Sequence, residues 1–68
     1  MMHQLTLLVW NDEHKDWGVL RTVEYNDFKV KGEMNKAQAL KYLNDQKNQW
    51  QRTVFLNKTM RIEGGENA

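Results

Sequence analysis

The chain contains no cysteine among its 68 residues. This absence excludes a disulfide framework, a zinc knuckle and a thiol nucleophile, and it fits a reducing compartment. A chain this short buries only about 60% of the surface that its unfolded form exposes, so its core must be small. Because no disulfide adds stability, association into a homodimer is an open alternative.

Long apolar runs and targeting signals are missing too. The N-terminal stretch MMHQLTLLVW has a short apolar run without a basic flank or a small-residue cleavage site. It resembles neither a signal peptide nor a membrane span, so we expect a cytoplasmic protein with no membrane contact. No internal repeat is present. Residues 1–63 are expected to form one domain, followed by a flexible polar tail, Gly64 to Ala68.

The residue patterns that catalysis needs are also missing. The sequence has no glycine-rich phosphate loop, no Ser-His-Asp arrangement and no pair of carboxylates that can be assigned to a cleft. His3 is expected to face solvent at a strand end. A cluster of acidic and histidine residues could bind a metal ion, but its spacing matches no known ligand pattern. A polar loop between two strands is enough to explain its members, Asp12, Glu13, His14 and Asp16. We expect no enzymatic activity, no cofactor and no metal site.

One segment, Asn35 to Trp50, has the pattern of a helix. Asn35 is a favourable N-cap, and Gln38 can return its hydrogen bond to complete a capping box. One helical face is mostly apolar and collects Ala39, Leu40, Leu43, Gln46, Lys47 and Trp50. Since the other face is polar, the helix is predicted to lie on a sheet with its back in water.

Strand-like sequence precedes this helix. Gln4–Trp10 and Trp17–Tyr25 are rich in β-branched and aromatic residues, and their two tryptophans could meet across the intervening loop. The second of these strands is predicted to form a hairpin with residues 28–32 about an Asn26-Asp27 turn. That register produces an aromatic, an aliphatic and a charge pair, namely Tyr25 with Phe28, Val23 with Val30 and Glu24 with Lys29. It also places Arg21 on the same face as Val19 and Tyr25.

A further hairpin is predicted after the helix. It pairs Arg52–Leu56 with Thr59–Glu63 about an Asn57-Lys58 turn, so that Phe55 faces Met60. The predicted fold class is therefore α+β, with the order β-β-β-α-β-β. An antiparallel sheet of four to five strands packs on one helix.

Charge is distributed unevenly along the chain, although its net charge is only +1. Residues 1–28 carry two cations and five acidic groups, whereas residues 29–61 carry eight cations and two acidic groups. In a nucleic-acid-binding protein the phosphate contacts would include Lys29, Lys31, Arg52, Lys58 and Arg61. The alternative is that these residues form a solvated surface.

The aromatic residues are too many for one small helix to cover. Trp10, Trp17 and Tyr42 are expected at the surface, where together with Arg21 they would anchor a protein partner. The alternative is that the two tryptophans pack only on each other. Several aliphatic residues are also expected away from the helix, which favours a second chain or a target on the other sheet face, namely Leu8, Leu20, Val54 and Leu56.

These observations favour a small non-enzymatic binding protein that docks on a larger protein or nucleoprotein complex and inhibits or modulates it. Small modulators of this class are common on phages and mobile elements. The alternative is a sequence-tolerant DNA- or RNA-binding module that uses the basic segment 29–61. A structural subunit of a homo-oligomer is a third interpretation, supported by strands that are apolar on both faces.

Overall fold

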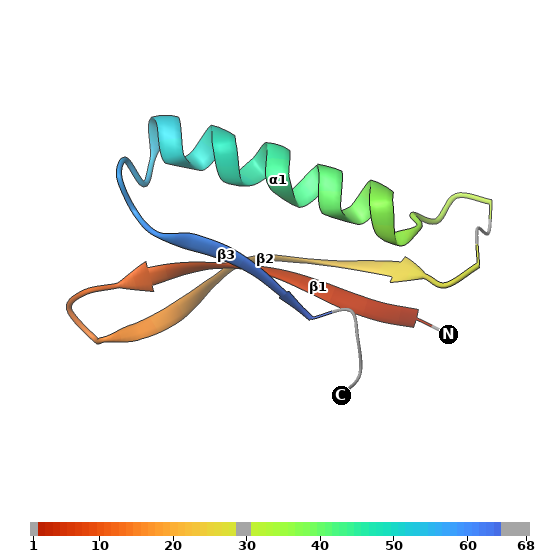
Figure 1. Ribbon diagram of the computed structural model, residues 1–68, viewed down its shortest axis with the longest axis horizontal. Helices are drawn as coiled ribbons and strands as arrows, with labels where there is room; N and C mark the ends of the chain where they lie inside the picture. Colours follow the sequence, from red (N-terminus) through yellow and green to blue (C-terminus); the bar gives the residue numbers. More distant parts are fainter. Residues whose placement is uncertain (1, 29–30, 65–68) are drawn as a thin grey trace.

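The computed structural model describes residues 2–28 and 31–64. In this part of the chain the elements follow one another as β1 (Met2–Asn11), β2 (Asp16–Asn26), α1 (Lys36–Thr53) and β3 (Met60–Gly64). The strands form one antiparallel sheet in the order β2-β1-β3, so β1 is central. Helix α1 lies over one face of this sheet (Figure 1). The α+β class is confirmed, and the described residues form a three-stranded sheet in place of the predicted four to five strands.

Strands β1 and β2 form a long hairpin. Their register pairs Leu5 with Val23 and Trp10 with Trp17. The Asn11 side chain closes the turn, since its Oδ1 accepts the backbone N–H groups of Glu13 (2.9 Å) and His14 (3.3 Å). The polar loop predicted between the two strands is therefore a tight turn over residues 12–15.

A β-bulge in β2 decides which side chains face the helix. Leu7 pairs with Arg21 but Leu8 pairs with Val19, so Leu20 is the additional residue. The bulge leaves both Leu20 and Arg21 on the helix side, where Leu20 packs against the core. Val19 is turned to the other face and is 65% exposed. The predictions that Val19 shares a face with Arg21 and that Leu20 points away from the helix are therefore wrong, because both assumed unbroken alternation.

Of the residues predicted to form a hairpin with β2, the described ones, 28, 31 and 32, are not in a strand. Strand β2 is an edge strand that pairs with β1 along its length. After Asn26 the chain leaves the sheet, and the Asn26 N–H donates to the Met34 carbonyl oxygen at 3.0 Å. Phe28, the predicted partner of Tyr25, is 76% exposed. The other two predicted pairs involve Lys29 and Val30, which lie outside the described residues.

Helix α1 begins as the sequence predicts. The capping box is present in full, with the Gln38 N–H donating to Asn35 Oδ1 at 2.9 Å and the Asn35 N–H donating to Gln38 Oε1 at 3.0 Å. Ala39 and Leu43 are fully buried on the face toward the sheet. The helix continues three residues beyond the predicted end, to Thr53, and Val54 is its C-cap.

This extension removes the predicted strand at residues 52–56. Arg52 and Thr53 belong to the last helical turn, and the Val54 and Phe55 N–H groups both donate to the Trp50 carbonyl oxygen. The predicted turn residue Asn57 does have a positive φ of 64°, but its turn joins the helix to β3. Strand β3 pairs with β1, where Met60 lies opposite Val9, not opposite Phe55. Strand β1 gives β3 a longer apolar strand to pair with than the predicted partner, residues 52–56, would have given.

Gly64 ends β3 with a conformation that a side chain would not tolerate. Its φ is +102°, and a Cβ atom there would lie 2.5 Å from the carbonyl oxygen of Gln4 on β1. Gly64 therefore belongs to the sheet and allows β3 to lie close to β1. The rest of the tail expected after residue 63, residues 65–68, lies outside the described residues.

The hydrophobic core occupies one layer between α1 and the sheet. It comprises Leu5, Leu7, Val9, Tyr25, Ala39, Leu43 and Met60, with Leu20, Val23, Met34, Leu40, Tyr42, Trp50, Phe55 and Ile62 packed around it. The Cα positions span only 12 Å in the shortest direction, against 40 Å in the longest. Figure 1 looks down this shortest direction and shows α1 stacked on one face of the sheet, while no described element covers the other face.

Candidate protein-docking surface

The uncovered side of the sheet, here called the open face, is the most distinctive surface of the molecule. Alternation along β1 and the two registers assign its side chains. They are Gln4, Thr6, Leu8, Trp10, Trp17, Val19, Thr22, Glu24, Arg61 and Glu63. The face has an aromatic half beside the hairpin turn and a polar half toward the other end of β1.

The aromatic half is built around two tryptophans. Trp10 and Trp17 are cross-strand partners whose rings meet edge to face, with centroids 5.3 Å apart and planes at 71°. The guanidinium of Arg61 lies 4.3 Å from the centroid of the Trp17 ring. Both tryptophans are half-buried. The contact that the sequence left open across the loop, the alternative to a pair of free anchors, is therefore formed, and Arg61 is added to it.

The contact between Arg61 and Trp17 passes beside Leu8, which is almost fully buried. Leu8 is only 8% exposed although the helix does not cover it. Arg61 stands on β3 and Trp17 on β2, with β1 between them, so the arginine side chain must cross β1 beside its partner Leu8. Val19, on the other side of Leu8, receives no such cover and is 65% exposed.

The polar half has the character of a solvated sheet face. The hydroxyl groups of Thr6 and Thr22 are hydrogen-bonded at 3.3 Å. Glu63 forms an ion pair with Arg61, and Glu24 is exposed opposite Gln4. Antiparallel sheets commonly present such a polar face to water.

The other two predicted anchors lie on the helix side of the sheet. Arg21 Nη1 donates to the Tyr42 hydroxyl at 3.1 Å, and its guanidinium lies 5.7 Å from the centroid of the Trp50 ring. Tyr42 is half-buried against the core rather than free at the surface. The four anchors predicted as one site, Trp10, Trp17, Arg21 and Tyr42, thus separate into two clusters on opposite faces of the sheet. Each cluster includes a residue that the prediction left out, Arg61 in one and Trp50 in the other.

The cations predicted to contact nucleic acid are spread over the molecule. Lys31 precedes α1, whereas Arg52 lies in its last turn, and the 18-residue helix between them is about 27 Å long. Lys58 lies in the turn before β3, and Arg61 is on the open face. Lys29 lies outside the described residues. The described members of this set therefore do not share one face.

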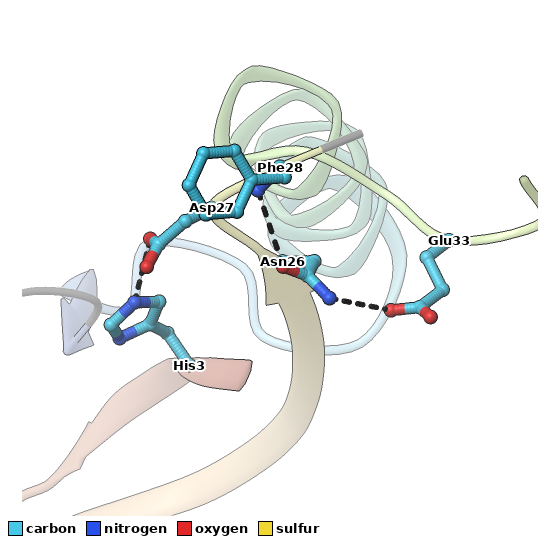
Figure 2. Close-up of polar contacts among 5 residues, drawn as sticks. All are labelled: His3, Asn26, Asp27, Phe28 and Glu33. Atoms are coloured by element: carbon cyan, nitrogen blue, oxygen red, sulfur yellow. Dashed lines mark hydrogen bonds and ion pairs between the residues drawn. The ribbon is translucent and has the colours of Figure 1, made fainter. Parts of the chain in front are cut away.

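His3 is not the solvent-facing residue that the sequence predicts. Its side chain is 14% exposed, its ring stacks on Tyr25 with centroids 5.2 Å apart, and its Nε2 lies 2.7 Å from Asp27 Oδ1. Figure 2 shows this contact beside Asn26, whose side chain accepts the Phe28 N–H and donates to the Glu33 carboxylate, both at 3.2 Å. These contacts fasten the chain that leaves β2 to the start of β1.

The acidic hairpin turn is organised by backbone contacts. Asp16 Oδ1 accepts the N–H of Trp17 at 2.7 Å, and Asn11 holds the N–H groups of the turn. Within residues 2–28 and 31–64, no three or more acidic, histidine or cysteine residues are grouped to hold a metal ion.

Charge separates between the two layers of the fold. Helix α1 carries four cations and one acidic group, Lys36, Lys41, Lys47 and Arg52 against Asp45. The open face and the hairpin turn carry two cations and four acidic groups, Lys15 and Arg61 against Asp12, Glu13, Glu24 and Glu63. The charge imbalance along the sequence thus becomes a basic helix layer and an acidic sheet layer.

No helix in the described part of the chain is long and apolar enough to cross a membrane. Comparisons of the chain with protein-family models, with curated proteins and with solved structures gave no match.

Proposed function

We propose that this protein is a small non-enzymatic binding module that docks through its open face on a larger protein or nucleoprotein complex and thereby inhibits or modulates it. The observation that carries this proposal is the group formed by Trp10, Trp17 and Arg61 on the uncovered side of the sheet. Tryptophan is among the residues that most often dominate the binding energy of protein interfaces.

A purely structural role for this group leaves part of the surface unexplained. Packing over Leu8 accounts for the positions of Trp17 and Arg61. It does not account for Val19, an apolar side chain that is 65% exposed beside them. The polar half of the same face resembles an ordinary solvated sheet, whereas the aromatic half has the apolar centre and polar rim of an interface.

Nucleic-acid binding has less support from the positions of the cations. Phosphate contacts usually converge on one surface, whereas Lys31 and Arg52 lie at opposite ends of α1 and Arg61 is paired with Glu63. We therefore treat binding of DNA or RNA as an outcome that the experiment must be able to detect.

The experiment is affinity capture from a lysate of the source organism, with and without nuclease, using matched variants as bait. Trp10→Ala and Trp17→Ala remove the indoles of the open face. Phe28→Ala removes another exposed ring, 76% exposed, at the far end of β2 and outside the open face, and serves as the control. Far-UV circular dichroism and thermal unfolding establish that each bait is folded.

We expect a stoichiometric protein partner that survives nuclease, is captured by the wild type and by Phe28→Ala, and is lost with either tryptophan variant. Capture that is equal for all baits would contradict docking through the open face. Capture of nuclease-sensitive material that depends on Arg52 and Lys58 would instead identify a nucleic-acid-binding module.

A further inference from the structure

We propose, building on the docking function above, that the open face receives an extended, arginine- or lysine-bearing segment of the partner protein. The proposal names the chemistry of the occupant, which the docking function leaves open. Three observations support it: the arginine that Trp17 already contacts, the charge of the surrounding surface, and the distance between Trp17 and Glu24.

Arg61 shows that the aromatic half binds a guanidinium. Its Cζ lies 4.3 Å from the centroid of the Trp17 ring, closer than the 5.7 and 5.9 Å that separate Arg21 from the rings of Trp50 and Tyr42. A cation is attracted to the face of an indole more strongly than to the other aromatic rings. Arg61 therefore occupies, within the chain, the position that an arginine of a partner would take.

The surroundings of the tryptophan pair favour a positive occupant. Arg61 is ion-paired with Glu63, so its own charge is largely balanced. Glu24 is an exposed carboxylate at one end of the open face, and the hairpin turn supplies Asp12 and Glu13, against one cation, Lys15, at the other. An incoming cation would thus meet both an indole face and unneutralised carboxylates.

The same charges disfavour two other occupants. A second copy that presented its own open face would bring two acidic surfaces together, and a nucleic acid would bring phosphates to them. The basic helix layer of a second copy has a suitable sign, but that contact would be head to tail, so it would form rings or filaments rather than a two-fold dimer.

The spacing indicates an extended segment rather than a single side chain. Trp17 and Glu24 lie on the same face of β2, and six steps of about 3.3 Å place them about 20 Å apart once the bulged residue is discounted. An extended chain of about seven residues covers that distance, and its alternate side chains point to the same side. Arginines in alternate positions would therefore reach Trp17 and Glu24 together.

The test uses a ten-residue synthetic peptide of alternating arginine and threonine as the probe, titrated into the ¹⁵N-labelled full chain at about 0.15 M salt. We expect saturable amide shifts at Leu8, Val19 and Thr22, with the amides of the outer side of α1, such as Lys41 and Asn48, unchanged. The control probes are a peptide of alternating glutamate and threonine and a single-stranded oligonucleotide, neither of which should produce these shifts.

Two charge reversals separate a local contact from the effect of net charge. Glu24→Lys and Asp45→Lys change the net charge equally, and both carboxylates are exposed, but only Glu24 lies on the open face. Charges farther apart than about 8 Å are screened at this salt concentration. We expect Glu24→Lys to weaken peptide binding about threefold or more and Asp45→Lys to leave it unchanged.

Replacement of the internal cation should strengthen binding. Arg61→Met keeps an aliphatic side chain over Leu8 but removes the guanidinium that competes for Trp17. We expect this variant to bind the arginine peptide about two- to fivefold more tightly, and Trp17→Leu to cancel that gain. An arginine with only a structural role would give no gain.

The proposal is overturned if the arginine peptide causes no saturable shifts, if both charge reversals weaken its binding equally, or if Arg61→Met weakens it. Shifts caused by the oligonucleotide alone, or growth of the protein into concentration-dependent oligomers by light scattering, would also overturn it in favour of those occupants. If the tryptophan variants lose the captured partner while Glu24→Lys retains it and the peptide does not bind, the docking function stands and the basic segment is excluded.

Discussion

The two faces of the sheet are covered in different ways, although they share the same central strand. Leu7 on the helix side is 0% exposed, and Leu8 on the open face is 8% exposed. Leu7 is enclosed by a separate element, α1, whereas Leu8 is covered by side chains of the neighbouring strands, Trp17 and Arg61. Low exposure alone therefore does not identify a core residue. A residue that is covered only by side chains becomes accessible to a partner when one of those side chains changes its rotamer.

The largest expected difference concerns these two leucines. Leu7→Ala creates a cavity between helix and sheet that rigid neighbours cannot fill, and it should destabilise the protein by about 4–5 kcal/mol. Leu8→Ala leaves a space that Trp17, Arg61 and water can enter, and it should have an effect nearer to about 2 kcal/mol. Urea unfolding followed by circular dichroism measures both. Equal effects would mean that the open face is packed as tightly as the core.

The attachment of β3, which supplies Arg61 to the open face, depends on Gly64. Gly64→Ala combines a φ of +102° with a Cβ only 2.5 Å from the Gln4 carbonyl oxygen, and we expect a loss of about 2–3 kcal/mol. Gly32→Ala is the matched control, because its φ is +84° but no atom lies within 4 Å of the new Cβ. Its expected effect is about 1 kcal/mol. Thermal unfolding of the two variants separates the cost of the close contact at Gly64 from the cost of a positive φ alone. A smaller loss of stability for Gly64→Ala than for Gly32→Ala would show that β3 is not held close to β1 at this position.

The two arginine clusters offer a finer comparison. Arg21→Met removes a hydrogen bond to Tyr42 and the contact with Trp50, and it should cost about 1 kcal/mol of unfolding free energy. Arg61→Met removes an exposed ion pair and one ring contact, so we expect a loss of about 0.5 kcal/mol or less. Chemical unfolding resolves this order, and a larger loss at Arg61 would make its role on the open face structural.

The local parts of the fold are those that the sequence predicts well. Asn35 and Gln38 are three residues apart, and their capping box forms as predicted because it needs no distant partner. The contact of Trp10 with Trp17 was also predictable, since the two residues flank one short turn. The general pattern of one amphipathic helix over an antiparallel sheet follows from periodicity alone.

The parts that depend on distant pairing were not predictable. Turn residues suggested partners next in sequence for both β2 and β3, but both strands pair with β1, which lies between them in the sheet. The bulge at Leu20 has no signature in a single sequence, yet it places the side chains of Val19 and Arg21 on opposite faces of the sheet. Because Arg61 reaches the open face only through the pairing of β3 with β1, its contact with Trp17 could not be anticipated either.

The most direct test of the docking surface uses two valines of equal exposure. Val19 is 65% exposed on the open face, and Val54 is 64% exposed at the end of α1. Because both are at the surface, Val19→Gln and Val54→Gln should each change stability by less than about 0.5 kcal/mol. With the two variants as baits in lysate capture, we expect Val19→Gln to lose the partner and Val54→Gln to retain it. Equal capture by both would contradict the assignment of the open face as the docking surface.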